Sequence, residues 1–388
     1  MGIIDQEIKK RKILLVSDGL FPSVLLCGKN QLDYLATKGL IDFKFVLSIQ
    51  LNRKYLDWAD TVVFVRSCED FELECARAVK ESGRGVVYVM DDDLLNLPND
   101  VSCANQFRGK QDNILKFISV SDVLLTPNRN LAKTYGQYAS RTELIEEPGY
   151  AYEKIQRKRE GPIRIGFAGS LDRSLDINSI LRSSVERILL KYGKDHVSFE
   201  FFGAYPDFAK QLGLKHINYV DSYKQYCSAM LSLNWDIGLA PMPETDFHKN
   251  KYYNKYIEYS SYGIPTIYSD YEPYMWVVKN GENGILVKNN PEEWYIALCK
   301  LIDDAELRER IGNTCWKDIR NHFSLEKLSV TYLNALPKSN VDIRPVKVKI
   351  GALKTGYFLK RYMTKIGKYG WKTPVVFVRK LRALLEQY

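Results

Sequence analysis

Two lysines and a glutamate stand close together in the stretch FHKNKYYNKYIEY, at Lys251, Lys255 and Glu258. If the chain is helical from Asn250 onward, their i, i+4 and i+7 spacing puts them on one face near the helix N-terminus. Cations at that end oppose the helix dipole, a local cost that is expected to persist where an anion binds. The same run would also suit an exposed, ion-paired helix face. The spacing therefore indicates either an anion site or a solvated surface.

A second group of candidates lies in the stretch IGFAGSLDRS. Gly169 and Ser170 end a predicted strand, and Arg173 follows three residues later. In α/β sheets a glycine at this point lets the backbone approach a ligand, and the next helix offers free N–H groups to a phosphate. Gly169 alone is equally consistent with an ordinary strand-to-helix turn. Arg173 beside it favours the phosphate.

A carboxylate cluster, Asp91 to Asp93, follows the apolar run GVVYVM. An Asp at a strand end can orient or deprotonate a hydroxyl group, although such a cluster is also a common loop feature. The four histidines show no metal-ligand spacing, and only His248, which lies between the candidate lysines and the preceding strand, stays open as a functional residue. The sequence contains no P-loop, and Gly83-Arg-Gly85 precedes a strand instead of following one, so it is not a dinucleotide fingerprint.

The elements that must position these residues alternate between short apolar runs and amphipathic stretches, which predicts parallel, doubly wound sheets. The predicted strands of the first half are Lys12–Ser17, Phe43–Ser48, Thr61–Arg66, Gly85–Met90, Val123–Pro127 and Thr142–Pro148. Those of the second half are Ile163–Gly169, Val197–Gly203, Ile217–Asp221, Trp235–Pro241, Pro265–Asp270 and Asn283–Lys288. Two Rossmann-like units facing a cleft are the expected architecture.

This pattern divides the chain into three segments. The polar stretch Ala151–Pro162 is the predicted linker, so residues 1–158 form the expected N-terminal domain and residues 159–338 the expected C-terminal domain. The alternation stops after Pro337, and residues 339–388 form a basic, aromatic tail. Within this tail Thr373 and Pro374 are expected to begin an amphipathic helix.

The chain has 388 residues, of which 45% are hydrophobic and 27% are charged, a balance that excludes a disordered or collagen-like protein. The net charge of +9 comes from the tail, which contains 12 basic and 2 acidic side chains, so the rest of the chain is close to neutral. The seven cysteines never show Cys-x-x-Cys spacing, which argues against a zinc site or a disulfide framework and favours a reducing cytoplasm. No stretch approaches the length of a membrane-spanning helix, and the first apolar run is too short for a signal peptide.

From Ile163 to Leu336 the chain resembles the donor domain of GT-B glycosyltransferases of the GT4-like kind (glycosyl transferases group 1). The resemblance lies in a strand ending near Pro241, the helix Lys-x-x-x-Lys-x-x-Glu-Tyr, the Gly-Ile-Pro before the next strand, and the segments NGENGILV and PEEWYIALCKLIDDAELRERIG. It implies a GT-B fold that binds a nucleotide-sugar in the cleft between the domains.

The resemblance also implies roles for individual residues. Glu258 would hold the ribose hydroxyls of the donor, and Arg173, Lys251 and Lys255 would surround its diphosphate, beside the loop of Gly169 and Ser170. Among these, Arg173 and Lys255 would act as catalytic cations. Asp91 and Asp92 fall near the point where many relatives have a catalytic His-Asp pair that lines the acceptor side.

The sequence departs from the family pattern at two positions. Ser170 stands where many relatives carry an arginine, and Asn250 where many carry the first of two glutamates. Glu244 is the one nearby residue that could replace that glutamate. The departures leave the sugar and the nucleotide base open.

The expected activity is transfer of a sugar from a nucleotide diphosphate-sugar to a hydroxyl group of a lipid-linked or cell-surface glycan. Fixed cations and helix N–H groups would stabilise the departing diphosphate, so no metal and no other cofactor is expected. The resemblance implies retention of anomeric configuration, whereas Asp91 or Asp92 acting as a base would suit inversion. The alternatives are another Rossmann-type sugar-nucleotide enzyme, such as an epimerase or dehydrogenase, or a catalytically silent scaffold.

The spacing Asp91-x-Asp93 resembles the metal-binding Asp-x-Asp of GT-A glycosyltransferases, in which two carboxylates grip a divalent ion. Such triplets arise often by chance, and a second Rossmann-like half has no place in a GT-A fold. We therefore expect no metal site here.

The tail mixes cations with aromatic side chains, including Tyr357, Phe358, Tyr362, Tyr369 and Trp371. This composition suits the surface of an anionic membrane, but it would also suit a helix that packs back across both domains with a solvated basic face. Nucleic-acid binding is not expected, because no reader module accompanies the charge. The expected location is the cytoplasm, at the inner face of the cell membrane.

Overall fold

A computed structural model describes residues 10–99, 101, 104–150, 152, 161–220, 222–338, 342–351, 353–355 and 357 of the chain. The N-terminal residues 1–9, most of the predicted linker and the predicted tail helix from Thr373 lie outside the described residues. Within the described part, no helix combines the length and the apolar character that crossing a bilayer requires.

The first half of the chain forms a six-stranded parallel sheet in the order β2-β1-β3-β4-β5-β6. Every residue of β3 and β4 is buried, so the sheet has helices on both faces. Its strands are β1 Arg11–Ser17, β2 Ile41–Leu47, β3 Thr61–Val65, β4 Gly85–Val89, β5 Val123–Thr126 and β6 Thr142–Leu144. The helices are α1 Pro22–Val24, α2 Asn30–Thr37, α3 Arg53–Trp58, α4 Asp70–Glu81, α5 Ala104–Phe107, α6 Gln111–Val120 and α7 Arg129–Tyr135.

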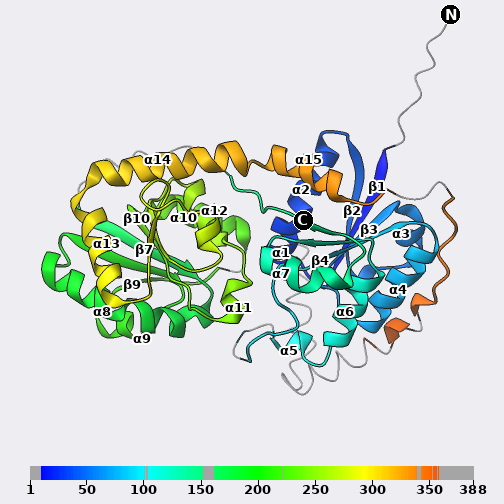
Figure 1. The fold of residues 1–388 in the computed structure, drawn as a ribbon, viewed down its shortest axis with the longest axis horizontal. Helices are drawn as coiled ribbons and strands as arrows, with labels where there is room; N and C mark the ends of the chain where they lie inside the picture. Colours follow the sequence, from blue (N-terminus) through cyan, green and yellow to red (C-terminus); the bar gives the residue numbers. More distant parts are fainter. Residues whose placement is uncertain are drawn as a thin grey trace, which may run out of the picture.

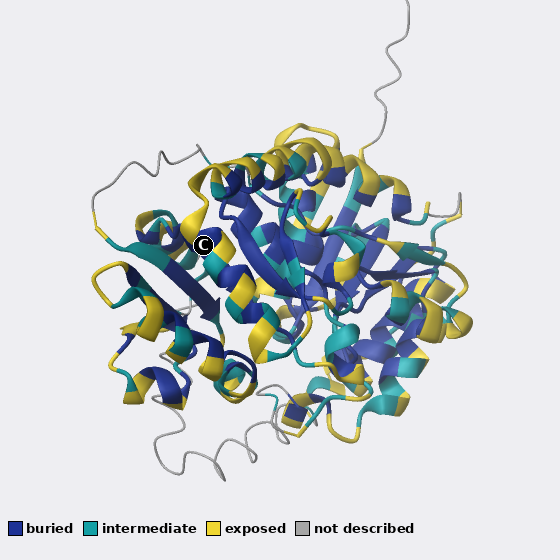
Figure 2. Ribbon diagram, turned by 60° about the vertical axis from the view of Figure 1, so that its left-hand side comes forward, coloured by how far each residue is buried: buried dark blue, intermediate teal, exposed yellow. Residues whose placement is uncertain are grey.

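The second half forms another six-stranded parallel sheet, in the order β12-β11-β10-β7-β8-β9. Its strands are β7 Ile163–Gly169, β8 Val197–Gly203, β9 Lys215–Ile217, β10 Ile237–Ala240, β11 Thr266–Ser269 and β12 Ile285–Val287. Its helices are α8 Ser174–Tyr192, α9 Asp207–Gln211, α10 Tyr223–Leu233, α11 Asp246–Lys249, α12 Asn254–Ser261 and α13 Pro291–Asp303. Both sheets are dark with buried residues, and the exposed residues lie on the outer helices (Figure 2).

The predicted fold class is confirmed, because both halves are doubly wound parallel sheets. One strand is displaced: the apolar run at Ile217 predicts a strand through Asp221, but β9 ends at Ile217, and Asp221 lies outside the described residues. The register explains the shift, since Lys215 to Ile217 pair with Glu200 to Phe202 at the open edge of the sheet. Alternation of apolar residues alone does not reveal where pairing with β8 stops.

The chain crosses between the halves twice, at neighbouring places. The first crossing follows β6, and the second passes from α14 Ala305–His322 to α15 Leu325–Ala335. The two crossings are joined by a hydrogen bond from the Gly149 amide to the Phe323 carbonyl, at 2.9 Å. In Figure 1, α14 and α15 run along one side of the molecule, with α14 over the second half and α15 beside α2 of the first.

The chain returns to the first half with α15. Tyr332 and Leu336 are buried in the core beneath the first sheet, and Val346 is buried in the core on its other face. The predicted boundaries 1–158, 159–338 and 339–388 stay predictions. In the structure, residues from both the second and the third of these segments pack on the first.

Each sheet has one point at which the strand order reverses. In the first sheet this point lies between β1 and β3, and in the second between β7 and β10. Ligands of doubly wound sheets bind at the carboxyl ends of the strands at such points. The two halves face each other with these ends, so a ligand site is expected between them.

Candidate active site

A cleft of about 620 Å³ lies between the two halves, at the carboxyl ends of both sheets. On the second half its walls include Gly169, the last residue of β7, and Pro241, directly after β10. On the first half they include Arg66, directly after β3, and Asp91, which follows β4. The cleft therefore lies where the reversal of strand order in each sheet predicts a ligand.

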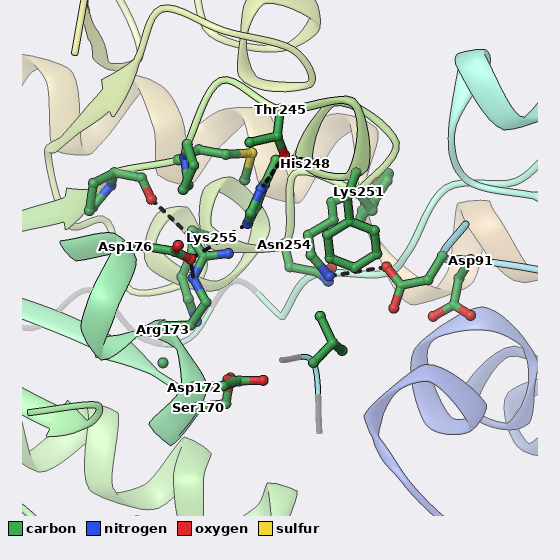
Figure 3. A pocket seen from close by; sticks show the side chains of 18 of the residues that line it. Asp91, Ser170, Asp172, Arg173, Asp176, Thr245, His248, Lys251, Asn254 and Lys255 are labelled. Atoms are coloured by element: carbon green, nitrogen blue, oxygen red, sulfur yellow. Dashed lines mark hydrogen bonds and ion pairs between the residues drawn. The ribbon is translucent and has the colours of Figure 1, made fainter. Parts of the chain in front are cut away.

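The predicted donor-binding residues all line this cleft: Gly169, Ser170, Arg173, Lys251, Lys255 and Glu258. Figure 3 shows Arg173 and Lys255 on the same side of the cavity, with Asp91 on the opposite side. The Arg173 guanidinium donates to the Pro241 carbonyl at 3.1 Å and pairs with Asp176 at 3.3 Å. These two contacts fix a cation beside the N-terminus of α8, where helix N–H groups also favour an anion.

Glu258 is held by two partners in the cleft. It accepts a hydrogen bond from the Tyr226 hydroxyl at 2.9 Å, and the Lys255 ammonium pairs with the same carboxylate oxygen. Both charged side chains project from α12, as their i, i+3 spacing predicts. This arrangement places a carboxylate and a cation next to each other at one end of the cleft.

The condition that the chain is helical from Asn250 onward is not met, because the helix begins at Asn254. The chain forms two short helices, α11 and α12, and residues 250–253 lie in the break between them. Two side chains of the break are held by the first half: Asn250 donates to Asp93 at 2.9 Å, and the Lys251 ammonium lies 3.3 Å from Asp92. Because Lys251 is outside the helix, it faces the opposite wall of the cleft instead of sharing a helix face with Lys255 and Glu258.

Arg66 is a cation of the first half that our sequence analysis did not identify as functional. Its guanidinium donates to both oxygens of Asp91 and, at 2.7 Å, to Asp92. Its backbone has a φ of 53°, an uncommon conformation for a residue with a side chain. The sequence did hold a signal that Arg66 belongs to the site: it directly follows a fully buried strand, next to the strand that precedes Asp91.

Asp92 is ionised throughout the neutral range. Burial by itself would raise the pKa of its carboxyl, but Lys251 and Arg66 outweigh burial and lower the pKa to about 2. A carboxylate with so low a pKa is a poor acceptor for the proton of a hydroxyl group near neutral pH. The geometry therefore makes Asp92 an electrostatic partner of two cations.

Asp93 points away from Asp91. It accepts hydrogen bonds from the Tyr135 hydroxyl at 2.6 Å and from Asn250, whereas both oxygens of Asp91 are engaged by Arg66. The two carboxylates of the Asp91-x-Asp93 spacing thus have separate partners and do not converge on one point.

Glu147 lies at the floor of the cleft with 2% of its surface exposed. One carboxylate oxygen accepts a hydrogen bond from the Cys27 thiol at 3.2 Å, and the other has no hydrogen-bond partner among the described residues. Burial raises the pKa of this carboxyl well above its usual range, and the charge of Asp91 raises it further. Ligand atoms of Cys27, Asp91 and Glu147 lie within 4.8 Å of one another, but Arg66 places a positive charge against this group.

His248, which the sequence leaves open, also lines the cleft. Its Nδ1 lies 2.8 Å from the Thr245 hydroxyl, and its Nε2 lies 3.5 Å from the Asp176 carboxylate. Burial by itself would raise the pKa of Asp176, but the hydrogen bond from His248 and the charge of Arg173 outweigh burial and lower it. The residues His248 and Asp176 thus link α11 to the start of α8 across the cleft wall.

A second cavity of about 170 Å³ adjoins the cleft and shares four lining residues with it, Gly169, Ser170, Lys255 and Glu258. Much of its remaining wall is aromatic. It comes from β8, from the segment before α10 and from α10 itself, with the side chains Phe202, Tyr219, Tyr223 and Tyr226. Aromatic walls accept a flat ring by stacking. The chain thus provides a polar cleft and, beside it, an aromatic cavity.

The structure brings the predicted donor residues together with the predicted acceptor-side aspartates in one cleft. The sequence analysis missed Arg66, Glu147 and the aromatic cavity. Glu147 carries no local signal, because the neighbours that place it, Cys27 and Asp91, are far from it in the sequence.

Residues 255–317 match the family model "Glycosyl transferases group 1". The chain matches no curated protein sequence. The family match covers α12 through most of α14, including Lys255 and Glu258.

The whole fold is similar to solved glycosyltransferase structures. HepE of Anabaena, solved in complex with UDP, has a TM-score of 0.56 at 13% identity, covering 83% of this chain and 98% of that one. Sucrose-phosphate synthase of Thermosynechococcus elongatus has a TM-score of 0.59 at 12% identity, covering 84% and 98%. The lipopolysaccharide outer core galactosyltransferase WaaB has a TM-score of 0.53 at 14% identity, again covering 84% and 98%. The predicted GT-B fold is thereby confirmed, and the match over residues 255–317 supports membership of the glycosyl transferases group 1 family.

Proposed function

We propose that the chain is a GT4-like glycosyltransferase that moves a sugar from a nucleotide diphosphate-sugar to a hydroxyl acceptor. The observation that carries this proposal is the convergence of Arg173, Lys251 and Lys255 on one cleft at the carboxyl ends of two doubly wound sheets. The family match over residues 255–317 supports the same activity.

The donor is proposed to lie across the cleft and the adjoining cavity. Arg173, Lys255 and the N-terminus of α8 would hold the diphosphate, and Glu258 would accept hydrogen bonds from the ribose hydroxyls. The aromatic cavity beside Glu258 would hold the base. HepE and its UDP complex make a uridine nucleotide the first candidate for this chain.

The proposed reaction is metal-independent. Charge develops on the diphosphate as its bond to the sugar breaks, and fixed cations stabilise that charge in the transition state. Arg173 and Lys255 are held in place by Pro241, Asp176 and Glu258, so this stabilisation needs little reorganisation.

The proposed stereochemical outcome is retention. Inversion would need a base on the acceptor side, and the pKa of Asp92, lowered to about 2, makes it a poor one. Asp91 has both oxygens bound by Arg66. In retention the departing diphosphate itself accepts the proton of the acceptor hydroxyl, while Asp91 and Asp92 orient Arg66 and Lys251.

The acceptor is proposed to be a lipid-linked or cell-surface glycan, met at the cytoplasmic face of the membrane. Residues 339–388 carry 12 basic and 2 acidic side chains, and a cation near an anionic bilayer contributes about 1 kcal/mol. WaaB, whose fold is similar, acts on lipopolysaccharide outer core by its name.

Calorimetric titration tests the donor. UDP-, GDP-, dTDP- and ADP-sugars are titrated into the purified protein in the presence of EDTA, and micromolar binding of the UDP-sugar alone is expected. Binding that appears only after Mg²⁺ or Mn²⁺ is restored would overturn metal independence. Binding of one donor without turnover on any glycolipid acceptor would favour the silent-scaffold alternative.

A further inference from the structure

The described residues 342–351, 353–355 and 357 come after α15 and lie along the first half; we call them the strap. Near its start, the Arg344 amide donates to the Ser82 carbonyl at 2.9 Å, and the Arg84 guanidinium donates to the Arg344 carbonyl. The Val346 amide then donates to the Asp57 carboxylate at 2.7 Å. These partners lie at the ends of α3 and α4, next to the amino ends of the strands.

The other end of the strap lies near the carboxyl ends of the first sheet. The Lys354 ammonium donates to the Ile49 carbonyl at 2.7 Å, in the segment after β2. The Tyr357 ring packs on Phe71 with 4.9 Å between ring centroids, and its hydroxyl donates to Asp18 at 2.9 Å. Asp18 directly follows β1, so the strap runs from the amino ends of the first sheet to its carboxyl ends.

Asp18 begins the loop that leads from β1 to α1. Two residues of α1 reach the site: Pro22 lines the aromatic cavity, and Ser23 lines the cleft. The second oxygen of Asp18 lies 3.4 Å from the Gln106 side chain of α5, and Val101, just before α5, also lines the cleft. Tyr357 is thus fixed beside the wall that the first half contributes to the cleft.

The basic sequence begins directly after Tyr357. Residues 358–388 contain eight Lys and Arg side chains and a single acidic one, Glu386. Because Tyr357 is bound to Asp18, the described part of the chain ends beside the loop that leads to α1 and the cleft.

The second half contributes exposed apolar side chains next to the same cleft. Leu171 and Leu175 are 63% and 73% exposed, and they alternate in sequence with the lining residues Ser170, Asp172 and Asp176. Leu190 is as exposed but lies at the far end of α8, about 22 Å along the helix from Leu175.

We propose that this entrance face, formed by the loop from Asp18, the segment around Val101 and the start of α8 around Leu175, docks on a bilayer that contains anionic lipids. The cations of residues 358–388 supply the attraction, because each one near an anionic surface strengthens binding about fivefold. Leu171 and Leu175 supply the apolar contact. The proposal deepens the proposed function, on which it rests: the cleft then opens toward the surface that carries the acceptor.

Hydrogen exchange locates the docking face on the full-length protein. Amide exchange is compared without and with vesicles of 30% phosphatidylglycerol in phosphatidylcholine. Slower exchange is expected at residues 18–23, 101–107 and 170–176, with no change in α13 and α14. Protection confined to α13 and α14, or absent from the entrance face while the protein is vesicle-bound, would overturn the proposal. Equal protection by the soluble polyanion dextran sulfate would also overturn it, because that result assigns the face to a polymer.

A matched pair of variants tests the apolar contact. Leu175→Glu should weaken vesicle binding about tenfold, whereas Leu190→Glu, on the same helix, should change it less than about twofold. Similar losses for both variants would show that the charge alone matters and would contradict the proposed face. Circular dichroism shows whether either variant is folded.

Titration of UDP without vesicles separates this inference from the proposed function. Normal UDP binding by Leu175→Glu together with lost vesicle binding supports both. UDP binding without protection of the entrance face by vesicles refutes only the docking. Protection by vesicles in a protein that binds no nucleotide refutes only the donor assignment.

Discussion

The cations of the cleft are paired with carboxylates of the chain itself. Lys255 pairs with Glu258 and Lys251 with Asp92, and each pair includes a group with a proposed ligand role. A diphosphate entering the cleft would compete with Asp92 for Lys251. Donor binding is therefore expected to loosen a contact between the halves while it forms new ones.

Glu258→Ala should weaken UDP binding about tenfold, because a hydrogen bond to a charged group contributes about 1.5–3 kcal/mol. The fold should persist, since this side chain is not part of either sheet core. Calorimetric titration measures the loss, and the exposed Glu282→Ala in the same half serves as control. Unchanged affinity for UDP would remove Glu258 from the donor site.

Glu147 predicts a pH dependence of stability. Burial raises the pKa of its carboxyl in the folded state, so the folded protein holds this proton more tightly than the unfolded chain does. Such a group destabilises the fold progressively as pH rises above the unfolded value of about 4.3 and through the folded value.

Glu147→Gln removes this titration, so it should raise the midpoint of thermal unfolding by about 2 °C at pH 7. At pH 4 the unfolded chain is also largely protonated, and the difference from the native protein should vanish. Calorimetry at both pH values measures the two gaps. A gain of equal size at pH 4 and pH 7 would mean that packing, and not the proton, separates the two side chains.

At the scale of residues, the sequence predicted the site residues that share a local motif. Lys251, Lys255 and Glu258 stand in one short stretch and all reach the cleft. Arg66 and Glu147 come from separate strand ends, and the folding of the first half brings both of them beside Asp91. No spacing within the sequence encodes that arrangement.

At the scale of elements, the break between α11 and α12 shapes the cleft. It lets Lys251 and Asn250 reach the first half, and it is supported from there by α7. Asn128 caps α7 by accepting from the amides of Asn130 and Leu131, and its amide group donates to the carbonyls of Lys249 and Lys251. One side chain thus stabilises a helix and holds the break.

Asn128→Ala should lower the free energy of unfolding by about 2–3 kcal/mol, because it removes a helix cap and two buried hydrogen bonds. Asn52→Ala is the matched control, since Asn52 caps α3 with two similar bonds and its side-chain amide donates to Gln50, also in the first half. Its expected cost is about 1 kcal/mol. Equal costs for the two variants in urea unfolding would show that the bonds to Lys249 and Lys251 contribute nothing.

The sequence predicted the strands of both sheets except β9, whose predicted run shares only Ile217 with it, because apolar runs bounded by turn residues are a strong local signal. It did not show that residues 250–253 are non-helical, because helix propensity in NKYYNKYIEY gives no sign of a break between α11 and α12. Both Tyr252 and Tyr253 donate to the Glu146 carboxylate, so a contact from the first half favours the non-helical backbone there. The break between α11 and α12 therefore depends on contacts between the halves, which local helix propensity does not reveal.

At the scale of the whole molecule, the strap belongs to the first half. Val346 is fully buried and Ile350 nearly so, and each buried aliphatic side chain contributes about 1.5–3 kcal/mol. The basic sequence that begins after Tyr357 is attached to this anchored segment. A test of membrane binding must therefore separate the strap from residues 358–388.

Deletion of residues 358–388 should leave the thermal midpoint within about 1 °C of the native value while vesicle binding is lost. Deletion of residues 339–388 also removes Val346 and Ile350 and should lower the midpoint by several degrees. Differential scanning calorimetry and vesicle sedimentation measure the two properties separately. Equal midpoints for both deletions would mean that the strap does not stabilise the first half.

The return of α15 and the strap to the first sheet has a consequence for biosynthesis. The first half draws core residues from the start of the chain and from residues beyond 330, with the whole second sheet synthesised in between. While the second half is emerging from the ribosome, the apolar surfaces that later receive Tyr332 and Val346 are still uncovered. All strands of the first sheet are translated before those of the second, but the core around the first sheet is completed only after the second sheet has been synthesised.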